Sequence, residues 1–223
     1  MPDAARVAVK ICGLRTADTV AAAVTAGADY LGFTFVTGSP REVSVADAAA
    51  LSADVPAGVV KVGLVVDPSD AFLRALTQAV PLDMLQLHGE EPPARVRDVR
   101  ARFGLPVMKA VGVADAADLD TAAEAAQAAD RLLLDARPPA GSDLPGGNGL
   151  SFDWRILTGR AWPVPWMLAG GLTPDTVAEA LRVSRAPGVD VSSGVERARG
   201  VKDPDLIRAF VAAARAPVEP AAI

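Results

Sequence analysis

The chain's single cysteine, Cys12, stands where an apolar run meets a glycine, in the stretch VKICGLR. A lone cysteine is most often a small buried hydrophobic residue. Here Cys12 ends an expected strand, and Lys10, two residues earlier, should point to the same side of it. A neighbouring ammonium group lowers the pKa of a thiol, and Gly13 lets the backbone turn away from the sulfur. Cys12 is therefore a candidate nucleophile or general base.

A carboxyl group ends a second apolar run. Asp135 follows three leucines in RLLLDA, where an ionised side chain is costly unless it is paired or used. Apolar surroundings favour the protonated carboxyl, so Asp135 could donate a proton near neutral pH. Capping of a following turn is the alternative. A thiolate base and a carboxylic acid from two strands could thus face each other across one site.

Two glycine-rich stretches, LAGGLTPD and VDVSSGVE, could hold an anion. Glycines let backbone N–H groups approach a phosphate closely, and such groups commonly bind phosphate after the last two strands of a barrel. Tight turns are the alternative explanation. The candidate phosphate-binding residues are Gly170, Gly171, Ser192, Ser193 and Gly194.

Several other polar side chains could line the same site. The guanidinium fork of Arg41, in GSPRE, suits a carboxylate or a phosphate, although a solvated surface arginine is the simpler reading. Asp190 could bind a hydroxyl or an amine, or pair with a neighbouring Lys or Arg. Gln86 and His88 share one strand face and, like Lys10, could line the pocket or belong to the core.

Eight short apolar runs alternate with eight longer, alanine-rich amphipathic stretches, which predicts eight strand–helix units. The expected strands are Val7–Ile11, Tyr30–Phe35, Val59–Val66, Met84–Leu87, Pro106–Val111, Leu132–Leu134, Pro165–Leu168 and Val189–Val191. The expected helices are Thr16–Ala26, Val45–Ala53, Ser69–Ala79, Glu91–Arg102, Asp115–Gln127, Phe152–Thr158, Pro174–Ser184 and Pro204–Ala214. This regular order favours an α/β fold of one domain, a closed (β/α)8 TIM barrel of eight parallel strands, over a doubly wound sheet.

The barrel is expected to span residues 1–215, followed by a flexible C-terminal tail, 216–223. Polar candidates follow the strands, where a barrel places its active site. The Gly- and Pro-rich segment 137–150 follows the candidate acid and could be a lid or a simple connection.

Composition limits the kinds of binding partner that the chain is expected to have. A net charge of −5 and a pI of about 4.9 argue against nucleic acid. One cysteine and one histidine, His88, leave little for a metal site, so no metal is expected. The sequence shows no signal peptide and no membrane-spanning run, and a free thiol fits a reducing cytoplasm. Monomer and homodimer both stay open.

In order along residues 9–210, the motifs VKICGL, ADYLGFTFVTGSPR, VGLVV, LQLHG, LLLDA, LPGGNGLSFDW, LAGGL, GVDVSSGVE and GVKDPDLIRAF resemble the phosphoribosylanthranilate isomerase family of tryptophan biosynthesis. The resemblance implies a (β/α)8 barrel without cofactor or metal. It also implies an Amadori rearrangement of N-(5-phosphoribosyl)anthranilate to 1-(2-carboxyphenylamino)-1-deoxyribulose 5-phosphate. Departures from the family pattern are few: Thr34, Thr37 and Glu42 flank the site.

The resemblance also assigns roles. Asp135 is expected to protonate the furanose ring oxygen, and Cys12 to remove the C2 proton from the resulting iminium. Arg41 is expected to hold the anthranilate carboxylate, and Asp190 to lie near the amine and the ribose hydroxyls. The phosphate is expected at the LAGGL glycines and the SSG residues.

Three other functions compete with this reading. A thiol hydrolase would use Cys12, His88 and Asp135 as a triad. A phosphosugar-binding barrel without catalysis would not need the Cys12/Asp135 pair. An isomerase acting also on an aminoimidazole ribonucleotide would be expected to have an aspartate in place of Cys12.

Overall fold

The computed structural model describes residues 6–137 and 152–216 of the chain. The expected tail falls almost wholly outside these ranges, as does the segment 137–150 that could act as a lid. Both therefore stay predictions.

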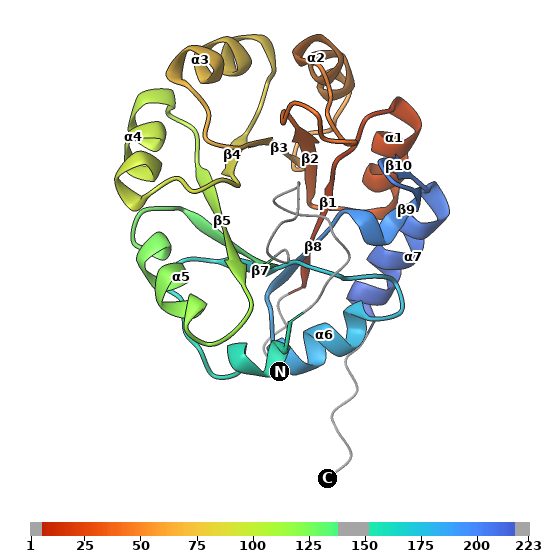
Figure 1. Cartoon of the computed structure of the whole chain (residues 1–223). Coiled ribbons are helices and arrows are strands. Elements are labelled where there is room, and N and C mark those ends of the chain that lie inside the picture. The colour runs from red at the N-terminus through yellow and green to blue at the C-terminus, as the bar shows by residue number, and fades with distance from the viewer. Residues whose placement is uncertain (1–5, 138–151, 217–223) are drawn as a thin grey trace.

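Eight parallel strands close into a barrel in sequence order, from β1 beside β2 around to β8, which pairs with β1 again (Figure 1). This confirms the predicted barrel and excludes the doubly wound sheet. The strands are β1 (Ala8–Cys12), β2 (Tyr30–Thr34), β3 (Val60–Val65), β4 (Met84–Leu87), β5 (Val107–Val113), β6 (Arg131–Ala136), β7 (Trp166–Leu168) and β8 (Gly188–Val191).

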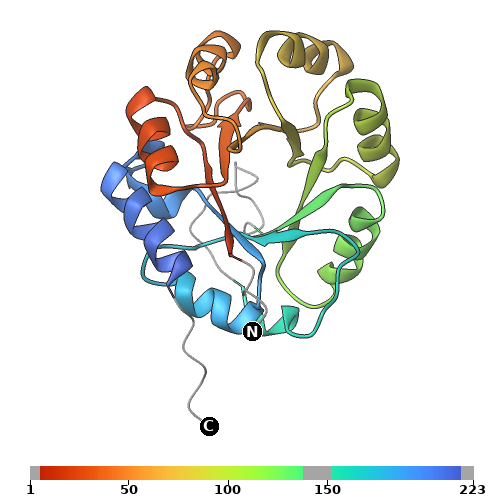
Figure 2. The same ribbon diagram turned by 180° about the vertical axis from the view of Figure 1, so that it is seen from behind.

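Helices surround the barrel as an outer ring, seen from the opposite side in Figure 2. Several begin where a side chain accepts a hydrogen bond from the first turn, as Ser69 does from Phe72 N and Asp203 from Leu206 N. The helices are α1 (Ala17–Ala26), α2 (Val45–Ala53), α3 (Asp70–Ala79), α4 (Pro93–Phe103), α5 (Asp118–Ala126), α6 (Val177–Ser184) and α7 (Pro204–Arg215).

Two elements differ from the sequence prediction. In the described part of the sixth unit, the segment after residue 151 forms the short 3₁₀ helix η1 (Trp154–Leu157), so the helix expected at Phe152–Thr158 is wrong in type and length. Between β8 and α7 the chain forms a 3₁₀ turn, η2 (Ser193–Val195), and an antiparallel hairpin, β9 (Glu196–Ala198) with β10 (Val201–Lys202), that was not expected.

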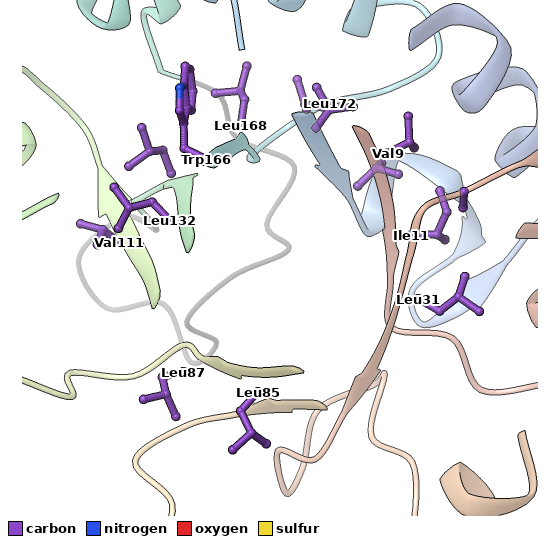
Figure 3. Close-up of a cluster of buried hydrophobic side chains, with 14 of the residues drawn as sticks. Val9, Ile11, Leu31, Leu85, Leu87, Val111, Leu132, Trp166, Leu168 and Leu172 are labelled. Carbon is purple, nitrogen blue, oxygen red and sulfur yellow. The ribbon is translucent and has the colours of Figure 1, made fainter. Parts of the chain in front are cut away.

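Strand alternation divides the buried side chains into two sets. One set, which includes Val9, Ile11, Leu85 and Leu87, points away from the middle of the barrel toward the helices (Figure 3). A second, smaller cluster lines the inside of the barrel: Val62, Met84, Met108, Ala110, Leu133, Met167 and Ala169. On each strand, the next side chain on the same face, two residues beyond this cluster, therefore points into the C-terminal end of the barrel. Active sites of this fold form at that end.

Candidate active site

A buried ion pair joins β1 and β8 inside the barrel. Lys10 Nζ lies 3.0 Å from Asp190 Oδ1, and the Lys10 side chain is wholly inaccessible to solvent. Burial alone would lower the pKa of Lys10, but the charges of Asp190 and Cys12 and their hydrogen bonds to the ammonium group together outweigh it, and the pKa is raised. Lys10 is therefore a fixed positive charge below the mouth of the barrel, and of the readings open for Asp190 the pairing with a lysine is the one seen here.

Cys12 lies on the same side of β1 as Lys10, next to the strand β2. A Cβ atom built on Gly32 would lie 2.9 Å from Cys12 Sγ, so the missing side chain of Gly32 is what leaves room for the sulfur. Burial raises the pKa of the Cys12 thiol, although the charges of Lys10 and Lys202 act in the opposite direction. The predicted net lowering of this pKa is thus wrong for the ligand-free protein, because desolvation exceeds the attraction of the ammonium group.

Gly32→Ala tests this placement of the sulfur. The added methyl must displace Cys12, and overpacking of this kind costs about 1–3 kcal/mol of the free energy of unfolding. A displaced sulfur should also lower turnover. Gly112→Ala is the matched control, since its Cβ would meet nothing nearer than 3.6 Å. Chemical denaturation measures the free energy of unfolding of both variants. Equal stability of the two variants would contradict the close contact between position 32 and Cys12 Sγ.

Asp135 occupies the interior-facing position of β6 two residues beyond Leu133, and it meets His88 from the end of β4. His88 Nε2 lies 3.4 Å from Asp135 Oδ2, and the other ring nitrogen, Nδ1, lies 2.8 Å from Gln86 Nε2. Both Asp135 and His88 are about 13 % exposed. The three side chains form a polar row from the barrel interior to its mouth, with Asp135 nearest to β7.

A cleft of about 360 Å³ opens beside this row, between the C-terminal ends of β4–β6 and the helix α5. His88, Lys109 and Asp135 are among its lining residues. Asp135 and His88 therefore border this cleft, whose lining does not include Cys12 or the glycines after β7. Within the described residues no hydrogen bond joins Cys12 to His88, so the geometry of a thiol hydrolase triad is not present.

The two candidate phosphate loops pack against each other. Gly170 and Gly171, which follow the end of β7 after one intervening residue, both have left-handed backbone conformations, with φ of 90° and 63°. Gly194 lies so close to Leu172 that a Cβ atom would come within 1.8 Å of the Leu172 carbonyl oxygen. N–H groups at the start of a helical turn such as η2 have no partner inside the turn. The structure therefore brings the glycines and the SSG residues into one backbone surface that could receive a phosphate.

Arg41 is buried rather than a solvated surface residue. Its Nε and Nη2 atoms donate to Glu196 Oε1 and Oε2 at 2.7 and 3.0 Å, and its aliphatic part lies over Gly13. Burial alone would raise the pKa of Glu196, but hydrogen bonds from Arg41 and Lys202 together lower it to about 2. Glu196 thereby fixes the direction of the guanidinium group, and no described residue accepts a hydrogen bond from its Nη1.

Lys202 extends this cluster to β8. Its ammonium group donates to Glu196 Oε1 at 2.7 Å, to Ser192 O at 2.9 Å and to Ser192 Oγ at 3.1 Å. Ser192 Oγ in turn donates to the carbonyl oxygen of Cys12 at 3.2 Å. Sequence reasoning passed over Glu196 and Lys202; their charges next to the SSG stretch, in GVE and GVKD, were the available signal.

The depressed pKa of Glu196 predicts an acid-sensitive contribution to stability. An unfolded glutamate titrates near 4.5, so this contribution is complete above pH 4.5 and is lost as the pH falls toward 2. A shift of this size corresponds to at most about 3 kcal/mol. In Glu196→Gln, the free energy of unfolding measured by urea denaturation should fall less steeply between pH 4.5 and 2 than in the unchanged protein. Parallel curves would contradict the ion pair.

The interior positions at the C-terminal strand ends thus carry Cys12 with Lys10 and Asp190 on one side of the barrel, and Asp135 with His88 and Gln86 on another. The packed glycine loops lie after β7 and β8, between them. In the described ranges no helix has both the length and the apolar character to cross a membrane, and no three metal-binding side chains gather. Fold and site together define an enzyme of the (β/α)8-barrel class.

Comparison with known proteins gives the family. Residues 9–213 match the family model described as N-(5'phosphoribosyl)anthranilate (PRA) isomerase. A protein of that name from Paracoccus denitrificans is 63 % identical over 212 residues, which cover 95 % of this chain and 99 % of the relative. The chain therefore belongs to the phosphoribosylanthranilate isomerase family, and it is an isomerase of tryptophan biosynthesis.

Solved structures agree. The phosphoribosylanthranilate isomerase of Thermotoga maritima is 37 % identical with a TM-score of 0.84, and the match covers 93 % of this chain and 98 % of that one. A second solved isomerase, 35 % identical with a TM-score of 0.80 and the same coverage of each chain, is in complex with reduced 1-(o-carboxyphenylamino)-1-deoxyribulose 5-phosphate.

Proposed function

We propose that this chain rearranges N-(5'-phosphoribosyl)anthranilate by acid–base catalysis, with Asp135 as the general acid and Cys12 as the general base. The observation that carries the proposal is the position of the two side chains. Both continue the interior-facing series of their strands, β1 and β6, to the C-terminal end of the barrel, on either side of the glycine loops after β7 and β8.

In the first step the protonated carboxyl of Asp135 gives its proton to the furanose ring oxygen. The bond between that oxygen and C1 breaks, and the electron pair on the anthranilate nitrogen forms an iminium, C1=N⁺. His88, 3.4 Å away, is the side chain placed to hydrogen-bond to the carboxylate left behind.

In the second step the Cys12 thiolate takes the proton from C2, and the C2 electron pair neutralises the iminium to give an enolamine. Tautomerisation moves the enol proton to C1 and leaves the ketone at C2. Solvent then returns Cys12 and Asp135 to their starting forms. Because burial disfavours the thiolate in the free protein, the positive charge of the iminium adds to that of Lys10 in favouring it when the base is needed.

The function itself is tested by following the fluorescence of phosphoribosylanthranilate, generated in situ from anthranilate and a phosphoribosyl donor. Purified protein should speed the loss of this signal in proportion to its concentration. If the signal decays at the uncatalysed rate whatever the protein concentration, the activity is absent.

Arg41 is proposed to bind the anthranilate carboxylate through Nη1, the guanidinium nitrogen that Glu196 does not occupy. Charged hydrogen bonds of this kind contribute about 1.5–3 kcal/mol. Arg41→Ala should therefore raise KM about ten- to a hundredfold with a smaller effect on kcat. Initial rates over a range of substrate concentrations check this split, and an unchanged KM would exclude Arg41 from the binding site.

Asp190 is proposed to contact the amine and the ribose hydroxyls, and the residues after β7 and β8 the phosphate: Gly170, Gly171, Ser192, Ser193 and Gly194. The proposed partner is thus a phosphorylated sugar carrying an aryl amine. Cytoplasmic location and a monomeric or homodimeric state stay predictions.

A further inference from the structure

The hairpin of β9 and β10 packs against the segment that carries Arg41. Its turn contains Gly200, where φ is 77° and a Cβ atom would lie 2.3 Å from the carbonyl oxygen of Pro40. Any side chain at Gly200 would push the hairpin away from the residue that precedes Arg41. The hairpin and the loop after β2 are therefore in direct backbone contact.

The carboxylate of Glu196, the first residue of the hairpin, has no capacity left for a ligand. Four donors approach its two oxygens: Arg41 Nε, Arg41 Nη2, the Gly200 N–H at 2.9 Å and Lys202 Nζ at 2.7 Å. A carboxylate accepts about four hydrogen bonds, and the Glu196 side chain is only 4 % exposed. Glu196 can thus act on a substrate only through the side chains that it holds, Arg41 and Lys202.

Lys202 is equally committed. Its three ammonium protons match three acceptors, Glu196 Oε1, Ser192 O and Ser192 Oγ, and its side chain is 2 % exposed. Through Ser192 it is linked to the backbone of Cys12. One continuous set of contacts therefore joins the guanidinium group of Arg41 to the strand end that carries the sulfur.

The charges of this cluster do not cancel. Among the described residues of the cluster, Arg41 and Lys202 are positive and Glu196 is negative, which leaves one positive charge in a nearly dry environment beside Cys12. An uncompensated buried charge is unfavourable and is relieved by an anionic partner. Glu196 restrains the orientation of Arg41 without removing the surplus charge that a carboxylate would meet.

We propose that Glu196 and Lys202 are positioning residues that set the specificity for an aryl amine bearing a carboxylate. They fix the direction of Arg41 Nη1 and its distance from Cys12. This inference rests on the function proposed above, because it assumes that Arg41 receives the carboxylate of the substrate.

The test compares two fluorescent substrates, phosphoribosylanthranilate and its counterpart made from methyl anthranilate, in which the carboxylate is a neutral ester. The readout is the ratio of their kcat/KM values, acid over ester. The unchanged protein should prefer the acid by about a hundredfold, the range expected for a charged hydrogen bond. Glu196→Gln and Lys202→Met should each reduce this ratio at least tenfold, and Lys202→Arg should retain more of it than Lys202→Met.

Glu179→Gln is the matched control, because Glu179 also forms a two-bond pair with an arginine, Arg182, on the exposed face of α6. Its ratio should equal that of the unchanged protein. A purely structural role for Glu196 would lower both kcat/KM values together and leave the ratio intact, which would overturn the proposal. If Glu196→Gln does not fold, the same ratio is measured for Glu196→Asp, whose shorter side chain draws the guanidinium back; an unaltered ratio there is equally contrary.

The outcomes also distinguish the proposed role of Arg41 from the positioning role of Glu196 and Lys202. Equal ratios in the unchanged protein and in Arg41→Ala would show that Arg41 does not read the carboxylate, and the proposed role of Arg41 would fail. If Arg41→Ala lowers the ratio of kcat/KM values while the folded Glu196 and Lys202 variants leave that ratio unchanged, only the positioning role is refuted.

Discussion

Replacing Cys12 by alanine is expected to lower kcat by about a thousandfold, within the range found for removal of a general base. Lys10, on the same strand face, cannot take over proton removal from C2, because Asp190 holds it protonated. The fold should survive, since alanine fills most of the small volume beside Gly32. Steady-state turnover, with the thermal unfolding midpoint measured in parallel, checks both statements.

The matched control for this variant is ligand binding. Cys12→Ala should bind the reduced product analogue, 1-(o-carboxyphenylamino)-1-deoxyribulose 5-phosphate, within a few-fold of the unchanged protein, because the proposed phosphate and carboxylate contacts are untouched. Full turnover in Cys12→Ala would remove the sulfur from catalysis. Loss of binding together with loss of turnover would make Cys12 a structural residue.

Asp135→Asn is expected to lower kcat by a similar factor, because the amide has the shape of the acid but no proton of suitable acidity for the ring oxygen. Its position beside His88 should be retained, since an amide can accept or donate a hydrogen bond there. Turnover and the unfolding midpoint again form the first measurement.

A deuterium label at C2 of the substrate separates Asp135 from Cys12. In Asp135→Asn, ring opening should limit the rate, so the isotope effect on turnover should approach one. In Cys12→Ser, where a weaker base removes the same proton, the isotope effect should be large. The reverse pattern would assign proton removal from C2 to Asp135 and ring opening to Cys12. Full activity in Asp135→Asn would exclude Asp135 as the general acid.

The barrel could be predicted from sequence because its strands are continuous apolar runs and because polar residues follow them so regularly. The failures have physical reasons. The segment Phe152–Thr158 has the composition of a helix but forms only the short 3₁₀ turn Trp154–Leu157. The β9–β10 hairpin consists of strands of three and two residues, too short for any alternating pattern.

Part of the candidate site could also be predicted from sequence patterns. Residue types and spacing singled out Cys12 and Asp135, and alternation alone put each on the inner face of its strand. The direction of the Cys12 pKa shift was wrong, because it depends on how completely the thiol is removed from water, and no local pattern contains that information. Glu196 lies 155 positions from Arg41 in the chain, so only the folded structure joins them.

The central claim is that Cys12 and Asp135 act on the same bound sugar phosphate from different sides. A crystal structure of this protein with the reduced product analogue tests it most directly. We expect Cys12 Sγ within about 3.5 Å of C2, the separation of groups poised to react, and the Asp135 carboxyl beside the oxygen on C4. A ligand whose sugar chain touches only one of these side chains, or neither, would contradict the account.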